Sequence, residues 1–136
     1  MGLSPNIWGS QTWHSIHAIA LAYPEKPTEE EKKQYDDFFK TLPDVLPCAI
    51  CGQHLRENYK LLPIQLGSQK ELFNWTVALH NLVNQQTNKP TITNEKALNE
   101  FFTNAKNTID PIYYLIGGIA IGGVGVLIAN SLARSK

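Results

Sequence analysis

The chain has 136 residues, enough for one domain of ordinary size with a short appended segment. Its 12 basic and 12 acidic residues balance, and no basic stripe appears, so we expect no nucleic-acid partner. The two cysteines are only three positions apart, which excludes a secreted fold stapled by several disulfides. No segment of useful length alternates with the period of a β-strand, so the sequence predicts an all-α fold.

Two helices are expected before the cysteines. The first runs from Ile7 to Ala22 and ends in the turn that contains Pro24. The second opens with a capping box, in which Thr28 and Glu31 satisfy each other's backbone amides. We expect Pro43 to stop this helix, because proline is poorly tolerated in a helix interior. Its inner side carries Tyr35, Phe38, Phe39 and Leu42.

The third helix contains the C-x-x-C formed by Cys48 and Cys51. We expect it to begin at Pro47, because proline is tolerated in the opening turn, and to end near Leu62. The spacing suits either a small reactive disulfide or two ligands of one metal ion. The helix start favours the disulfide, since the positive end of the helix dipole stabilises a thiolate.

Two further helices complete the predicted domain, residues 1–105. Ser68 and Glu71 predict a second capping box, followed by a helix from Gln69 to about Gln86. One face of that helix is an apolar stripe of Leu72, Trp75, Leu79 and Val83. The fifth, shorter helix spans about Asn94 to Asn104. Short connections predict an antiparallel four-helix bundle plus this short fifth helix.

The C-terminal part differs in composition, because no residue from Pro111 to Ala133 is charged. About twenty apolar residues suffice to cross a bilayer as a helix. We expect a juxtamembrane hinge at 106–111, a transmembrane helix at 112–133 and a basic tail at 134–136. A span so near the end of the chain predicts insertion after translation, with residues 1–110 facing the cytosol.

Two further clusters flank the cysteines in sequence. One contains two tryptophans and a histidine on the first helix, and the other contains Trp75, a histidine, two asparagines and Lys89. Each cluster alone is compatible with ordinary packing. Together they predict a site for a planar aromatic ligand, because aromatic rings stack on such a ligand, amides read its edge and a lysine meets a phosphate.

These motifs resemble the Erv/ALR family of FAD-linked sulfhydryl oxidases. Trp8-Gly9, Trp13 and His17 are similar to its first signature, and Leu46-Pro47-Cys48 with Cys51 to its redox disulfide. The run from Trp75 through His80-Asn81 and Asn84 to Lys89-Pro90 is similar to its nucleotide signature. His54 and the small size are most like members encoded by large cytoplasmic DNA viruses. This likeness implies that the membrane is a host membrane such as one derived from the endoplasmic reticulum, or that of a virion.

The resemblance implies FAD as the cofactor, O₂ as the electron acceptor, H₂O₂ as a product and no metal. It implies catalytic roles for Cys48 and Cys51, and a homodimer. The cofactor-binding residues that it implies are Trp8, Gly9, Trp13, His17, Tyr23, His54, Trp75, His80, Asn81, Val83, Asn84 and Lys89.

The sequence departs from the family in lacking a second, shuttle cysteine pair. The expected partner is therefore a thiol-containing protein substrate or a small dithiol relay protein. Two alternatives from other classes are a non-enzymatic zinc-binding helical module and a membrane-anchored virion structural or adaptor protein. The zinc module leaves the tryptophans, asparagines and lysine without a role.

Overall fold

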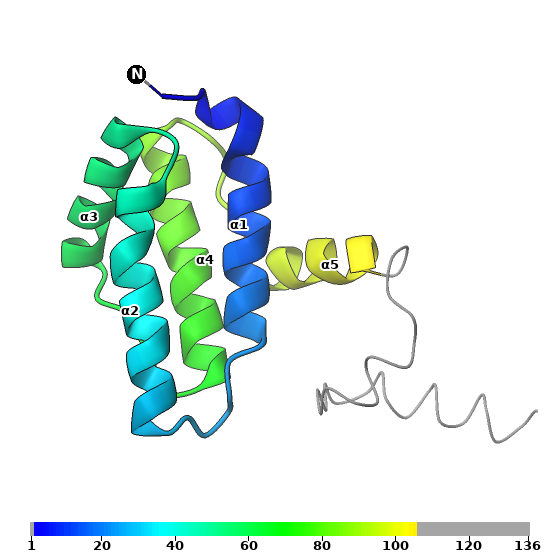
Figure 1. Ribbon diagram of the computed structural model, residues 1–136. Coiled ribbons are helices and arrows are strands. Elements are labelled where there is room, and N and C mark those ends of the chain that lie inside the picture. The colour runs from blue at the N-terminus through cyan, green and yellow to red at the C-terminus, as the bar shows by residue number, and fades with distance from the viewer. Residues whose placement is uncertain (1, 106–136) are drawn as a thin grey trace, which may run out of the picture. The chain divides into compact units, whose positions relative to one another are not determined.

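A computed structural model describes residues 2–105 of the chain. Its helices are α1 (Pro5–Leu21), α2 (Glu29–Val45), α3 (Ala49–Leu61), α4 (Gln69–Gln86) and α5 (Asn94–Ala105). Among the described residues there is no strand, which confirms the predicted all-α class. The helices α1 to α4 alternate in direction as an antiparallel bundle (Figure 1). In this bundle α1 packs chiefly against α4, and α2 against α3.

The expected hinge at 106–111, transmembrane helix at 112–133 and tail at 134–136 lie outside the described residues. Within residues 2–105, no helix combines the length and the apolar character needed to cross a bilayer.

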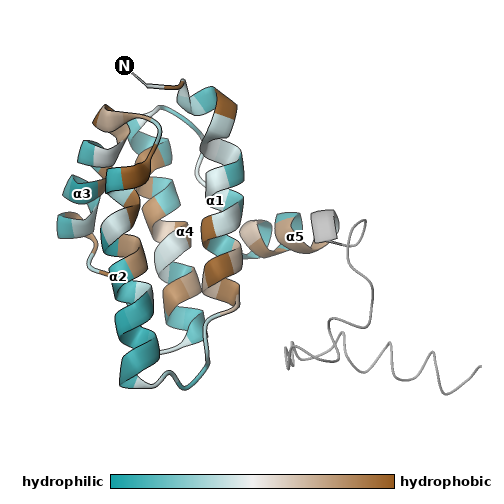
Figure 2. Ribbon diagram, in the orientation of Figure 1, coloured by the Kyte–Doolittle hydropathy of each residue, from teal (hydrophilic) through white to brown (hydrophobic). Residues whose placement is uncertain are grey.

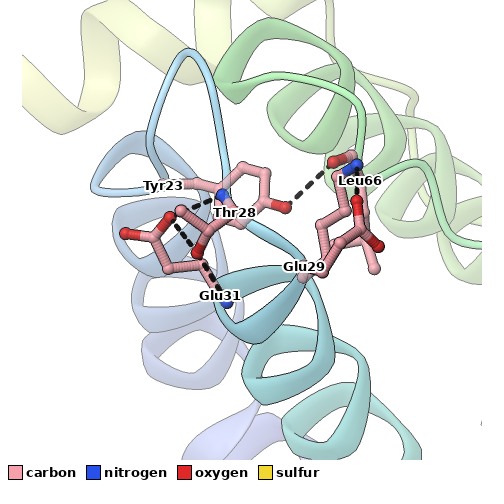
Figure 3. Close-up of polar contacts among 6 residues, drawn as sticks. Tyr23, Thr28, Glu29, Glu31 and Leu66 are labelled. Carbon is pink, nitrogen blue, oxygen red and sulfur yellow. Dashed lines mark hydrogen bonds and ion pairs between the residues drawn. The ribbon is translucent and has the colours of Figure 1, made fainter.

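Side-chain caps begin α2 and α4 at the predicted places, although only the first forms the full predicted capping box. Thr28 and Glu31 form the full capping box, with Thr28 N donating to Glu31 Oε2 at 2.7 Å and Glu31 N to Thr28 Oγ1 at 3.2 Å (Figure 3). Ser68 caps α4 by accepting from Glu71 N at 3.3 Å, without the return bond of a capping box. Such caps contribute about 1 kcal/mol each.

The core lies inside the bundle of α1 to α4, where α3 contributes Leu55, and α5 adds Ala97. Leu72, Trp75 and Leu79 of the predicted stripe are buried, whereas Val83 is only half-buried. Burying a leucine or an aromatic side chain contributes about 1.5–3 kcal/mol. The prediction for Phe38 is wrong, because this side chain is 39% exposed and only Phe39 beside it reaches the core. The first turns of α2 are strongly hydrophilic (Figure 2).

The predicted boundaries around the cysteines need two corrections. Pro43 lies inside α2, which continues to Val45. The helix tolerates it because Pro43 lies in the last turn and removes only one backbone N–H hydrogen bond. The third helix does not begin at Pro47. Cys48 is its N-cap, with an extended backbone and a sulfur that accepts from Cys51 N at 3.3 Å, so Ala49 is the first helical residue.

A glycine sets the distance between α2 and α3. A Cβ at residue 52 would collide with the carbonyl oxygen of Pro43, which is backbone and cannot turn away. Gly52 is buried and directly follows Cys51. The close approach of the two helices therefore positions the C-x-x-C.

Candidate redox site

The two cysteines form a disulfide at the N-terminus of α3, with Cα atoms 5.2 Å apart. Cys48 is 9% exposed and Cys51 is half-buried. The helix N-terminus favours a negative charge on the Cys48 sulfur, because unpaired amides and the helix dipole point toward it. In the described part of the chain, no three His, Cys, Asp or Glu side chains are grouped to hold a metal ion.

The N-terminal segment lies against this disulfide. Leu3 N donates to the Pro47 carbonyl at 2.7 Å, and a Cβ on Gly2 would lie 2.6 Å from the same oxygen. Trp8 holds the segment by donating from Nε1 to the Leu3 carbonyl at 3.1 Å. The indole N–H of Trp8 is thus engaged by the chain itself.

Trp13, His17 and His80 form a contiguous cluster between α1 and α4. The rings of Trp13 and His80 stack with centroids 4.2 Å apart and planes 8° apart. Nε2 of His17 lies 3.2 Å from Nδ1 of His80, and Nδ1 of His17 lies 3.0 Å from Thr76 Oγ1. The structure therefore brings together three residues that the sequence placed in two separate motifs.

Both histidines of the cluster are held uncharged. Burial lowers the pKa of His17 to about 4, assisted by the charges of His80 and His14. Burial also lowers the pKa of His80 to about 4, and the positive charge of Lys89 adds to this effect. Near neutral pH each ring therefore offers one N–H donor and one nitrogen acceptor.

The turn after α4 places Lys89 close to this cluster. Asn88 adopts a left-handed conformation (φ 55°), and Lys89 N donates back to the Asn84 carbonyl at 2.8 Å. Asn84 is buried, yet among the described residues its side-chain amide makes no hydrogen bond. The amide atoms themselves keep some accessible surface, so a ligand can reach this free amide and Asn84 is a candidate ligand-binding group.

Other predicted site residues have clear partners within the chain. Trp75 is buried, stacks edge-on against Phe39 at 4.9 Å and donates from Nε1 to the Leu62 carbonyl at 3.0 Å. Asn81 uses both ends of its amide on the backbone of Ile92, at 2.8 Å each. Asn81 thus fixes the segment after α4.

Three more predicted residues make no hydrogen bond or ring contact with the histidine cluster. Tyr23 is buried beyond the end of α1, and its hydroxyl donates to the Leu66 carbonyl at 2.9 Å (Figure 3). That end of the bundle is opposite the disulfide (Figure 1). His54 is exposed on α3, and Val83 is half-buried on α4. Their predicted cofactor contacts stay predictions.

The sequence interpretation missed two buried polar features. Thr76 is fully buried and bonded to His17, and Asn58 on α3 forms a reciprocal amide pair with Gln86 on α4, at 3.0 and 2.7 Å. Thr76 lies four residues before His80, which places both on one helix face. That spacing is a signal from which Thr76 could have been found.

An all-helical bundle with a C-x-x-C disulfide at the start of α3, and with a tryptophan and two neutral histidines packed between α1 and α4, is characteristic of a redox-active helical domain. The Erv1/Alr family model matches residues 10–105. The chain therefore belongs to the Erv1/Alr family, as its motifs predict.

Relatives and solved structures support this assignment. A probable FAD-linked sulfhydryl oxidase of Acanthamoeba polyphaga mimivirus is 41% identical over 100 residues, covering 71% of this chain and 69% of the relative. The FAD-linked sulfhydryl oxidase ERV1 of Arabidopsis thaliana is 38% identical over 81 residues, 60% of this chain but only 42% of the relative. The crystal structure of the FAD binding domain of Erv1 from Saccharomyces cerevisiae has a TM-score of 0.66 at 25% identity, covering 79% of this chain and 99% of that one.

The lowered pKa values predict a pH dependence of stability. Between pH 6.5 and about 4, His17 and His80 bind protons in the unfolded chain but not in the folded one. The free energy of unfolding should therefore fall as the pH falls through this window. Urea unfolding of the wild type and of the double variant His17→Gln/His80→Gln, at a series of pH values, measures this contribution.

The exposed His54 provides a control, and His54→Gln should keep the wild-type pH dependence. If the difference between the wild type and the double variant is the same at pH 7 and pH 4.5, the histidines are not held neutral by the fold.

Proposed function

We propose that the protein is an FAD-linked sulfhydryl oxidase that forms disulfide bonds in partner proteins, with O₂ reduced to H₂O₂. One observation carries this proposal: the only cysteines of the chain form a disulfide at a helix N-terminus, within a fold of the Erv1/Alr family. Disulfide exchange needs a stabilised thiolate and a leaving sulfur, and the start of α3 supplies both.

The residues of the chain carry the exchange as follows. A substrate thiolate attacks Sγ of Cys48, the sulfur–sulfur bond to Cys51 breaks, and Cys51 leaves as a thiolate. A second substrate thiolate then attacks the mixed disulfide, so the substrate leaves oxidised and both cysteines are reduced. Exposure alone would favour attack at Cys51, because Cys51 is the more exposed of the two. The choice of Cys48 as the attacked sulfur therefore rests on the family resemblance and on its position as the N-cap of α3.

The described residues fit a flavin dinucleotide. Gly9 is half-buried on α1, and a Cβ there would meet nothing within 4 Å, so a group of a ligand can approach the backbone. Asn84 supplies an unpartnered amide, and Lys89 supplies a cation for a phosphate. When bound, FAD supplies the oxidising capacity that returns the cysteine pair to the disulfide.

The proposal also includes the partner and the membrane. A relay role for a separate dithiol protein is supported by the sequence, which has no cysteines besides Cys48 and Cys51. The uncharged run from Pro111 to Ala133 supports an anchor, with residues 1–110 facing the cytosol. A homodimer is included on the strength of the family resemblance.

The cysteine variants test the activity. Cys48→Ser and Cys51→Ser should each abolish the oxidation of dithiothreitol, while FAD stays bound because the helices and not the sulfurs hold it. Oxygen consumption and flavin absorbance measure the two properties separately. Cys51→Ser should also trap a substrate or relay as a mixed disulfide on Cys48. Wild-type turnover in either variant would refute the mechanism, and trapping only by Cys48→Ser would reverse the roles of the two sulfurs.

Substitution of Gly9 tests the cofactor site without touching the cysteines. Gly9→Ala should raise the free energy of unfolding of the flavin-free chain by about 0.5–1 kcal/mol, because glycine is a poor helix former. Gly9→Leu should lower the affinity for FAD by about tenfold or more, because its side chain occupies the open space. Fluorescence titration with FAD measures the affinity.

Ser15→Leu, at an exposed position of the same helix, is the matched control and should bind FAD as the wild type does. Wild-type affinity in Gly9→Leu would show that the flavin does not approach this backbone.

Protease treatment of intact membrane vesicles carrying the protein tests the proposed topology. A cytosol-facing domain should be digested from outside, whereas complete protection of residues 1–110 would reverse the orientation. Recovery of the protein in the soluble fraction after carbonate washing would contradict the anchor itself.

A further inference from the structure

A continuous chain of hydrogen bonds leads from the backbone of α4 through Thr76 and His17 to His80. The Thr76 hydroxyl donates to the Phe73 carbonyl at 2.8 Å. Nδ1 of His17 lies 3.0 Å from the same hydroxyl oxygen, and Nε2 of His17 lies 3.2 Å from Nδ1 of His80. Thr76 and His17 are both buried, so water does not compete for the two bonds of Thr76, whereas the bond to the half-buried His80 lies nearer the surface.

The hydrogen bond from the Thr76 hydroxyl to the Phe73 carbonyl determines which atom is the donor in each of the other bonds. A backbone carbonyl only accepts, so the hydroxyl proton of Thr76 points to Phe73 and the Thr76 oxygen is left as an acceptor. His17 must then carry its proton on Nδ1. Its Nε2 is consequently the acceptor, and His80 must carry its proton on Nδ1 as well. Nε2 of His80 remains unprotonated, and it makes no hydrogen bond within residues 2–105.

We propose that Thr76 is a positioning residue that sets the tautomers of His17 and His80, so that Nε2 of His80 accepts a hydrogen bond from an N–H or O–H group of the bound flavin dinucleotide. This inference rests on the proposed function. His80 stacks on Trp13, which fixes the plane of its ring, and Thr76 fixes which edge of that ring can accept.

The neutrality of the two rings supports this arrangement. The pKa of each is lowered to about 4, with burial as the main cause, so neither ring is a double donor near neutral pH. A doubly protonated His17 would also donate from Nε2 to His80 Nδ1, and His80 would then carry its proton on Nε2.

Three variants of Thr76 separate its hydroxyl from its volume. Thr76→Val keeps the shape but removes the oxygen, so the Nδ1 proton of His17 loses its acceptor. The protons should then move to Nε2 on both rings, which turns the free nitrogen of His80 from an acceptor into a donor. Thr76→Ser keeps the oxygen and should restore the wild-type state, and Thr76→Ala controls for lost volume.

Nitrogen-15 NMR of the imidazole rings in the FAD-loaded full chain reports the tautomers directly. Both rings should carry the proton on Nδ1 in the wild type and in Thr76→Ser, and on Nε2 in Thr76→Val. The dissociation constant for FAD should rise by about tenfold in Thr76→Val and stay unchanged in Thr76→Ser. Circular dichroism verifies that each variant is folded, and if Thr76→Val does not fold, Thr76→Ala carries the comparison with Thr76→Ser.

The outcomes distinguish this inference from the function on which it rests. A wild-type protein that binds FAD but carries the His17 proton on Nε2 would overturn the role of Thr76 and leave the oxidase assignment intact. If Thr76→Val and Thr76→Ala both keep the wild-type tautomers, the proposed role of Thr76 is also wrong. Failure of the wild type to bind FAD at all would overturn both.

Discussion

The contact between Gly52 and the Pro43 carbonyl is the constraint on which the geometry of the disulfide depends. No side chain fits between α2 and α3 at this level, and the residue concerned directly follows Cys51. Pro43 makes the contact possible from the other side, because α2 continues through it and presents its carbonyl to α3. The start of α3 is therefore held by backbone against backbone. A reactive disulfide on such a support keeps the direction of its sulfurs better than one on a loop would.

Specific polar contacts join the disulfide helix to the histidine helix, in addition to the apolar contact between Tyr59 and Trp75. Asn58 on α3 and Gln86 on α4 form a reciprocal pair of amide hydrogen bonds, at 3.0 and 2.7 Å. The Trp75 indole N–H adds a second link, to the carbonyl of Leu62. Satisfied buried polar pairs specify one register between two helices, whereas apolar packing tolerates small slips. The relative position of the cysteines and of His80 is thus fixed by specific bonds, although α1 and α2 supply most of the packing for these two helices.

Local signals predicted much of this structure, and non-local contacts explain what they missed. The bounds of α4 and the Thr28–Glu31 capping box depend on residues close in sequence, and both are confirmed. The motif around the cysteines and the tryptophan–histidine signature were enough to predict the family. The neighbouring residues in the sequence do not distinguish Trp75, which is buried in the core, from Trp13, which stacks on His80. That difference arises only when α1, α3 and α4 are assembled, and the same holds for Thr76, whose partner is 59 residues away.

The two helix pairs carry different groups of the candidate redox site. The pair α2–α3 carries the sulfurs, and the pair α1–α4 carries Trp13, His17 and His80. Residues 2–24 contain no Asp, Glu, Lys or Arg, so α1 brings no fixed charge to the cluster, and Lys89 is the cation that acts on His80. An uncharged aromatic wall with a single cation at its end suits a planar ring joined to a phosphate. The thiolate-stabilising helix start lies at the same end of the bundle as the N-terminus of α1 and the C-terminus of α4 (Figure 1). Cys48 at the start of α3 and Lys89 just beyond α4 are therefore both attached to helix ends at that end of the bundle.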